Sequence, residues 1–424
     1  MRNLQDVVLD KIIYNSLDDG RLLNVCWDML MMRNQESMKK WAAVFLIIAI
    51  VIGIAMIPQL NEYGAEGAMT AAENDFMYEK SIHILVMLLM GFGFLMVFVR
   101  KYGYTSVTVT YLAVALSLPL YMLIRPYLWG SAADISITNI SMLLFAEFAA
   151  ASLLIAIGGT LGRVNTHQYL LIGALFTPLY ALNEWILFSG AVIPAGAFLD
   201  TAGSITIHAF GAYFALGMII MLASKKEREI EVETSKRSNE FALLGSAALW
   251  VFWPSFCAAL VSVDKIPLVA INTILALCGA TIATYVFSIL IRGKIEVADI
   301  ANASLAGGVA IGASVANVTP GWSMLIGLIA GAISVFGYTI IQPRLQKATG
   351  GVDTCGVHNL HGMPGVFGGI IALGLVASPS WQLAGVIISV IFAITMGILV
   401  GFIASRLGKK ETLYDDKEEF IVPD

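Results

Sequence analysis

The chain has 424 residues, and its composition excludes an ordinary soluble globular protein. Hydrophobic residues make up 58% of the sequence and charged residues only 13%, well below the roughly 25% charged fraction of soluble domains. The net charge is −5, and no basic patch is interleaved with aromatic residues, so we expect no nucleic-acid partner. The composition predicts a polytopic helical membrane protein whose surroundings are the lipid bilayer.

Residues 1–40, before the first apolar segment, carry too many charges for a signal peptide and are expected to form an N-terminal cytoplasmic extension. Helical spacing of apolar residues between Leu4 and Leu17 favours an amphipathic helix on the membrane surface. An extension without such a helix is the alternative.

Twelve apolar segments have the length of a membrane-crossing helix. They are 41–57, 81–99, 107–124, 138–157, 168–188, 201–223, 241–263, 268–291, 298–316, 321–341, 354–377 and 381–404. We therefore expect an all-α bundle of 12 transmembrane helices, within a transmembrane domain at 41–404. The segment 41–57 is an extra helix ahead of the rest, and residues 405–424 form a cytoplasmic tail. The acidic residues of this tail are expected to be solvated: Asp415, Asp416, Glu418 and Glu419.

The basic residues indicate how the segments are oriented. If the amino terminus is cytoplasmic, only Lys80, Arg125 and Lys265 of the 25 Lys and Arg lie outside. This bias is the positive-inside pattern, and one missed helix would destroy it. We therefore expect both termini to be cytoplasmic, in a plasma or inner cell membrane.

An acidic residue followed eight positions later by a histidine occurs twice. Asp200 precedes His208, and Asp353 precedes His361, each at the start of a long apolar segment. Titratable groups are costly in lipid, so such groups within membrane segments indicate a function. The alternative is a pair of core histidines that only join helices. Each Asp is also placed to cap the first free amides of its helix.

The two pairs belong to two blocks of five segments, 81–223 and 241–377, which are followed by a last helix at 381–404. Because five is odd, the second block enters the membrane upside down, as in inverted-repeat transporters with a substrate site near the midplane. Eight residues of helix rise roughly 12 Å. In a hydrocarbon core of about 30 Å, His208 and His361 therefore approach the same depth from opposite faces.

Other titratable residues give weaker signals. His358 lies three residues before His361, where it suits a second pore residue or half of a metal pair. No third ligand is indicated, and the four cysteines lack a ligand spacing, so we expect no metal and no cofactor. Glu147 is expected to line an outer vestibule or else to be salt-bridged or exposed. His83 and His167 suit the membrane interface.

Several stretches resemble Rh glycoproteins, which are related to ammonium transporters. The two histidine helices are similar to Gly203-Ser-Ile-Thr-Ile-His208-Ala-Phe-Gly-Ala-Tyr-Phe and Asp353-Thr-Cys-Gly-Val-His358-Asn-Leu-His361-Gly-Met-Pro-Gly-Val-Phe-Gly. Further matches are Trp253-Pro-Ser-Phe256, Asn183-Glu184, Ala306-Gly-Gly-Val-Ala and Gly91-Phe-Gly-Phe-Leu. The resemblance covers roughly residues 75–404.

The resemblance implies a homotrimer without enzymatic activity, in which each subunit encloses a narrow, mostly apolar pore that conducts ammonia. By similarity, His208 and His361 are the twin pore histidines, and Asp200 and Asp353 match the acids of the family.

Two phenylalanines complete the site that the resemblance implies. Phe148 and Phe256 match the stacked phenyl rings that constrict the outer entrance of Rh proteins. Cys257 departs from the pattern, because many animal members have Asn at this position.

Three other functions remain open at this stage. Carbon dioxide is also small and neutral, so it is a second candidate passenger for the same pore. Intramembrane histidines can bind haem in membrane redox proteins, but the chain lacks several histidine pairs at cytochrome-like positions. A sensor is a third possibility, although no output domain accompanies the predicted helices.

Overall fold

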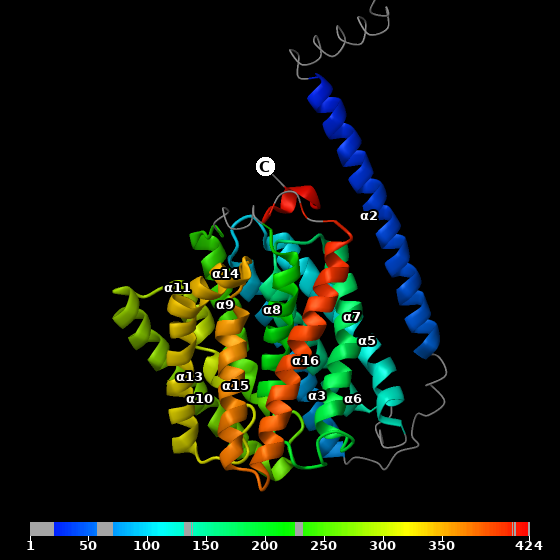
Figure 1. Cartoon of the computed structure of the whole chain (residues 1–424). Helices are drawn as coiled ribbons and strands as arrows, with labels where there is room; N and C mark the ends of the chain where they lie inside the picture. Colours follow the sequence, from blue (N-terminus) through cyan, green and yellow to red (C-terminus); the bar gives the residue numbers. More distant parts are fainter. Residues whose placement is uncertain are drawn as a thin grey trace, which may run out of the picture. The chain divides into compact units, whose positions relative to one another are not determined.

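The computed structural model describes residues 21–56, 71–130, 137, 139–224, 232–408, 410 and 413–422. The regular structure of these residues is helical, as the all-α prediction requires, and Figure 1 shows the bundle helices packed side by side. Ten of the described helices are long and apolar enough to cross a membrane, and Val297–Ile311 is a shorter apolar helix.

Helix α2 (Arg21–Met56) belongs largely to a unit of its own that ends at Ile54. Its candidate membrane span, Lys39–Met56, coincides with the predicted extra helix at 41–57. The helix begins well before this span, within the predicted cytoplasmic extension. The amphipathic helix predicted between Leu4 and Leu17 lies outside the described residues.

The first block of the bundle surrounds helix α6. Its elements are α3 (Ala71–Val86), η2 (Met87–Phe92), α4 (Gly93–Leu95), η3 (Met96–Phe98), α5 (Gly103–Trp129), α6 (Ile140–Thr160), α7 (Thr166–Phe188), η5 (Ser204–Ala209) and α8 (Phe210–Leu222). A helix that is apolar on every face is expected in the interior of a membrane bundle. α6 has this pattern and is buried along most of its length, between α3, α5, α7 and α8.

The second block is less regular. Its elements, with the last helix, are α9 (Lys236–Cys257), η7 (Val263–Lys265), α10 (Ile266–Arg292), α11 (Val297–Ala303), α12 (Ala306–Ile311), α13 (Pro320–Phe336), η8 (Gly337–Ile341), α14 (Gln342–Thr349), η9 (His358–Gly362), α15 (Met363–Ile371), η10 (Ala372–Gly374) and α16 (Pro379–Ser405). Among its predicted segments, 298–316 forms α11 and α12, and 354–377 forms η9, α15 and η10. Glycines at these places lower the helix propensity.

The α3 helix begins at Ala71, well before the predicted start at position 81. Charged residues such as Glu73, Asp75 and Glu79 end the apolar pattern of the sequence, but they do not end the helix. Acidic side chains near a helix N-terminus are favourable, because they face the positive end of the helix dipole. The membrane span and the helix that contains it therefore have different boundaries.

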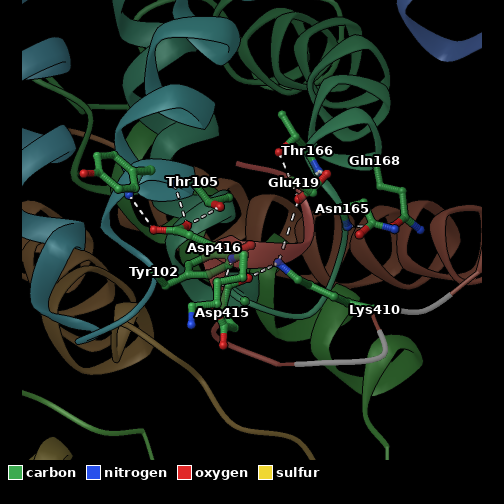
Figure 2. Close-up of polar contacts among 12 residues, drawn as sticks. Tyr102, Thr105, Asn165, Thr166, Gln168, Lys410, Asp415, Asp416 and Glu419 are labelled. Carbon is green, nitrogen blue, oxygen red and sulfur yellow. Dashed lines mark hydrogen bonds and ion pairs between the residues drawn. The ribbon is translucent and has the colours of Figure 1, made fainter. Parts of the chain in front are cut away.

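The acidic tail is packed against the bundle, which corrects the expectation that it is solvated. In residues 413–422, here called the C-terminal strap, Asp416 accepts hydrogen bonds from the amide (2.9 Å) and hydroxyl (2.6 Å) of Thr105, at the start of α5. Glu419 accepts a hydrogen bond from the amide of Thr166 (2.9 Å), at the start of α7 (Figure 2). Unpaired amides and the helix dipole make such N-termini attractive to carboxylates.

A buried lysine fixes the strap from its other side. The side chain of Lys410 is 0% exposed, its ammonium donates a hydrogen bond to the carbonyl of Asp415 (3.0 Å), and it lies 3.8 Å from the carboxylate of Glu419. It also lies over the ring of Tyr102 (Figure 2). Burial lowers the pKa of Lys410, while the carboxylates around it, Glu419 foremost, act to raise that pKa. Charge pairing therefore compensates for the burial of this cation.

Candidate functional site

Both histidine helices begin with the same carboxylate cap. Asp200 accepts hydrogen bonds from the amide and the hydroxyl of Thr206, each at 2.8 Å. Asp353 accepts them from the amides of Val357 (3.0 Å) and His358 (2.9 Å), so the predicted capping is confirmed at both places. Burial raises the pKa of each Asp to about 6, and the backbone hydrogen bonds act to lower it. The backbone hydrogen bonds thus favour the ionised form of each carboxyl group, and burial opposes it.

A glycine follows each of these acids at the same interval. Gly203 has φ +77° and Gly356 has φ +67°. This left-handed conformation is open to glycine without steric cost and is strained for other residues. It turns the chain into the π-helical openings η5 and η9, which carry His208 and His361.

The two blocks dock on each other reciprocally. The amide of Ala202, before the first histidine helix, donates a hydrogen bond to the carbonyl of Gly312 (2.8 Å), just after α12. The amide of Thr354, before the second, donates to the carbonyl of Gly159 (3.2 Å) in α6. Each histidine helix thus begins next to the third span of the other block, as an inverted repeat requires.

The inversion brings His208 and His361 together. Their Nδ1 atoms lie 3.2 Å apart, and the ring centroids lie 5.2 Å apart at an interplanar angle of 7°. Each residue is only 3% exposed. One Nδ1 must carry the shared proton and the other must accept it, because a hydrogen bond between two neutral imidazoles needs one donor and one acceptor. The predicted meeting of the two imidazoles is confirmed.

Aromatic rings continue from the histidine pair in one direction. The Trp253 indole is stacked on His208, with centroids 5.6 Å apart, and the Phe256 ring lies 6.0 Å from His208. Phe256 in turn contacts Phe148, with ring centroids 4.8 Å apart and an interplanar angle of 51°. The structure therefore places Phe148, Phe256, His208 and His361 in one buried row. We call Phe148 and Phe256 the gate pair.

A narrow cavity of about 20 Å³ is lined by His361 but not by His208, Phe148 or Phe256. Its lining is apolar apart from His361, Asn302 and Cys355, and it includes Phe92 and Leu360. A cavity needs about 10–15 Å³ to hold one water molecule. The space therefore suits single molecules of the size of water or ammonia.

Trp253 is a site residue to which the sequence assigned no role. It lies three residues before Phe256, and this spacing puts both rings on one face of α9. The approach of its indole depends on Gly308: a Cβ atom there would lie 2.4 Å from the ring. The i, i+3 spacing was the signal in the sequence, but the partner glycine could not be read from it.

The other candidate residues lie outside this row or at its edge. Glu147 is 0% exposed and accepts a hydrogen bond from Ser81 (2.7 Å), so the exposed alternative is wrong. His358 lies against Tyr213 rather than His208, with ring centroids 5.5 Å apart. Among the described residues, no group of three or more His, Cys, Asp and Glu side chains is placed to hold a metal ion.

The sequence profile of the Ammonium Transporter Family matches residues 42–418. The chain belongs to this family. The family comprises transporters and channels rather than enzymes, and the chain is accordingly a multi-pass membrane protein.

Individual relatives place the chain in the Rh branch of the family. It is 35% identical over 399 residues to ammonium transporter Rh type A of Bos taurus, covering 90% of this chain and 92% of the relative. It is 35% identical to Rh type B of Danio rerio, over 81% and 76% of the two chains. The solved structure of Nitrosomonas europaea Rh50 matches with 46% identity and a TM-score of 0.81, over 84% of this chain and 94% of that one. The resemblance to Rh proteins is therefore confirmed.

Proposed function

We propose that this Rh-family protein conducts ammonia through a pore that runs from the gate pair, past His208 and His361, to the cavity beyond His361. The observation that carries the proposal is the histidine pair: two buried imidazoles joined at 3.2 Å, between phenyl rings and an apolar cavity. Asp200 and Asp353 support it by capping the two helices that carry the imidazoles.

The proposed physical principle is the exclusion of charge. A bare cation in a medium of low dielectric constant loses solvation energy on the order of 20 kcal/mol by the Born estimate. Ammonium is excluded on this ground, whereas ammonia, after leaving its proton behind, is neutral and about the size of water. Among the described residues, neither the aromatic neighbours of His208 nor the cavity lining beside His361 includes a carboxylate that could compensate for this loss.

The imidazoles suit a passenger that both donates and accepts hydrogen bonds. Nε2 of His208 is buried without a hydrogen-bond partner among the described residues. A neutral imidazole can donate or accept at this nitrogen according to its tautomer, and ammonia fits either case. Binding through a single weak contact keeps release fast, as conduction requires.

The test is stopped-flow measurement of internal pH in proteoliposomes after an ammonium pulse. We expect the wild-type protein to raise the ammonia permeability above that of empty liposomes, and His361→Ala to change the flux or its selectivity while the protein still assembles. Wild-type vesicles indistinguishable from empty ones would contradict the proposal. Unchanged conduction by His361→Ala would contradict the role of the histidine pair.

Carbon dioxide is the second candidate passenger, since the same neutral, apolar row admits it. A parallel pulse of carbon dioxide on the same vesicles distinguishes the two gases. A haem-binding redox protein is a third candidate, and an absorbance spectrum of the purified protein tests it.

The assembly and topology are part of the same proposal. The resemblance to Rh proteins supports a homotrimer of independent pores in a plasma or inner cell membrane. Backbone hydrogen bonds join segments that are all predicted to be cytoplasmic. The amide of Arg100 donates to the carbonyl of Glu233, that of Asp416 donates to the carbonyl of Lys101, and that of Lys410 donates to the carbonyl of Arg163. These contacts support a cytoplasmic carboxyl terminus.

A further inference from the structure

The two residues of the gate pair lie on helices that are distant in the sequence. Phe148 is in the middle of α6, and Phe256 is in the last turn of α9. The opening between their rings therefore depends on how α6 and α9 are held relative to each other.

Helix α3 gives a side-chain hydrogen bond to the residue that precedes each gate phenylalanine. The Ser81 hydroxyl donates to Glu147, 2.7 Å away, which precedes Phe148. The Nδ1 atom of His83 lies 2.8 Å from the hydroxyl of Ser255, which precedes Phe256. One short stretch of α3 thus contacts both sides of the gate.

The positions of Ser81 and His83 on α3 explain how one helix reaches both partners. Residues two apart on an α-helix do not share a face, so Ser81 is directed to α6 and His83 to α9. Helix α3 packs against both of these helices. Ile82, between the two, is 41% exposed and takes part in neither contact.

Each contact matters more than an ordinary surface hydrogen bond. Glu147 is 0% exposed, and its second carboxyl oxygen has no partner among the described residues, so the Ser81 hydroxyl is its hydrogen-bond donor in the described part of the chain. Ser255 follows Pro254, which lacks an amide proton and weakens the hydrogen-bond ladder of the helix there. The His83 ring is further held against Phe252, with centroids 5.0 Å apart.

We propose that Ser81 and His83 are positioning residues of the gate pair: from α3, they set the spacing of Phe148 and Phe256 and hence the size of molecule that enters. This inference rests on the proposed ammonia pore. It assigns the size limit to a pair of polar contacts behind the phenyl rings rather than to the rings alone.

The test measures the permeability of proteoliposomes to methylamine and to ammonia and takes their ratio. We expect Ser81→Ala and His83→Ala each to raise the methylamine-to-ammonia ratio by about threefold to tenfold, the range that the loss of one hydrogen bond corresponds to. Ile82→Ala is the matched control, since it shortens a side chain on the same turn without touching either contact. It should leave the ratio unchanged.

Conservative variants separate positioning from a general loss of structure. Ser81→Thr keeps the hydroxyl, and His83→Asn keeps a polar group near the position of Nδ1, so both should retain a ratio close to that of the wild type. If Ser81→Ala does not fold, Ser81→Cys replaces the hydroxyl with a weak donor of similar size. An intermediate ratio is then expected, and a wild-type ratio contradicts the proposal.

The gate variants distinguish this inference from the pore on which it rests. Phe148→Ala should raise the ratio by itself, and Ser81→Ala should add nothing to it, because the contact then has no ring to position. If neither Phe148→Ala nor Phe256→Ala changes the ratio, the gate itself is wrong. If both raise it while Ser81→Ala and His83→Ala do not, only the role of α3 is wrong.

Discussion

The indole of Trp253 and the backbone at Gly308 show how little free space surrounds the histidine pair. The ring is 2% exposed, is stacked on His208, and lies where a Cβ atom of residue 308 would be. If an atom were added at residue 308, the indole would have to move toward the His208 ring or out of its packed position. A single methyl group at Gly308 should therefore displace the indole of Trp253 and disturb its stacking on His208.

We expect Gly308→Ala to destabilise the protein by about 1–3 kcal/mol, the usual range for overpacking, and to lower ammonia flux by displacing Trp253. Thermal unfolding in detergent and flux in proteoliposomes measure the two effects. Gly321→Ala is the matched control, because no atom lies within 4 Å of a Cβ built there. Equal behaviour of the two variants would show that the indole is not confined as described.

The sequence predicted the meeting of His208 and His361 because that meeting depends on only two quantities. Helical rise sets how deep each imidazole lies, and the odd number of spans in each block sets the direction of entry. The facing of the two Nδ1 atoms was not predictable, since it depends on the rings of Trp253 and Phe92 packed on either side. Likewise, the contact of Ser81 with Glu147 joins residues 66 positions apart, which no local spacing specifies.

At the scale of elements, the C-terminal strap is the largest difference from the sequence-based expectation. An acidic run outside the apolar segments is usually solvated. Here, however, the starts of α5 and α7 present unpaired amides at the same end of the bundle, and Asp416 and Glu419 reach them. The pairing of a tail with helix N-termini is a tertiary event, so the tail sequence alone does not reveal it.

Tryptic cleavage after Lys410 tests whether Asp416 fixes the strap. The side chain of Lys410 is 0% exposed, so the protease needs the strap to be released. Loss of an N-terminal cap costs about 1 kcal/mol, and we therefore expect Asp416→Ala to speed this cleavage about fivefold when release is fast relative to cutting. Asp264→Ala removes an exposed charge elsewhere and should not change the rate. A cleavage rate for Asp416→Ala equal to that of the wild type would show that the Asp416 carboxylate contributes little to holding the C-terminal strap on the bundle.

Element boundaries were less predictable than element existence. The predicted spans correspond to helical segments, yet α3 starts at Ala71 rather than at 81, and the span at 354–377 is divided into three short helices. Charged residues end the apolar pattern that is read from the sequence, but they do not end the helix itself. Conversely, glycines leave a segment apolar while they interrupt its regular hydrogen bonding.

For the whole molecule, the distribution of basic residues predicts which end of each helix is cytoplasmic. Lys265 and Lys294 are exposed at opposite ends of α10, and the positive-inside pattern puts Lys265 outside and Lys294 inside.

Cysteine labelling in sealed vesicles of known orientation tests this topology. With a thiol reagent that does not cross membranes, Lys265→Cys should react from the outer face and Lys294→Cys only after the membrane is made permeable. The signal of the unmodified chain is the baseline for its native cysteines. Labelling of both variants from one side would mean that α10 does not cross the bilayer.

The reciprocal docking at Ala202 and Thr354 restricts the kind of movement by which this protein can work. Backbone hydrogen bonds from each half of the molecule hold the segment that leads into the other half's histidine helix. A rocking of the halves that opens one membrane face and then the other would therefore have to break these bonds at both places. The interlock favours a passage whose walls stay in place while small molecules diffuse through in single file. The conduction rate of such a passage is set by side-chain fluctuations rather than by slower domain motions.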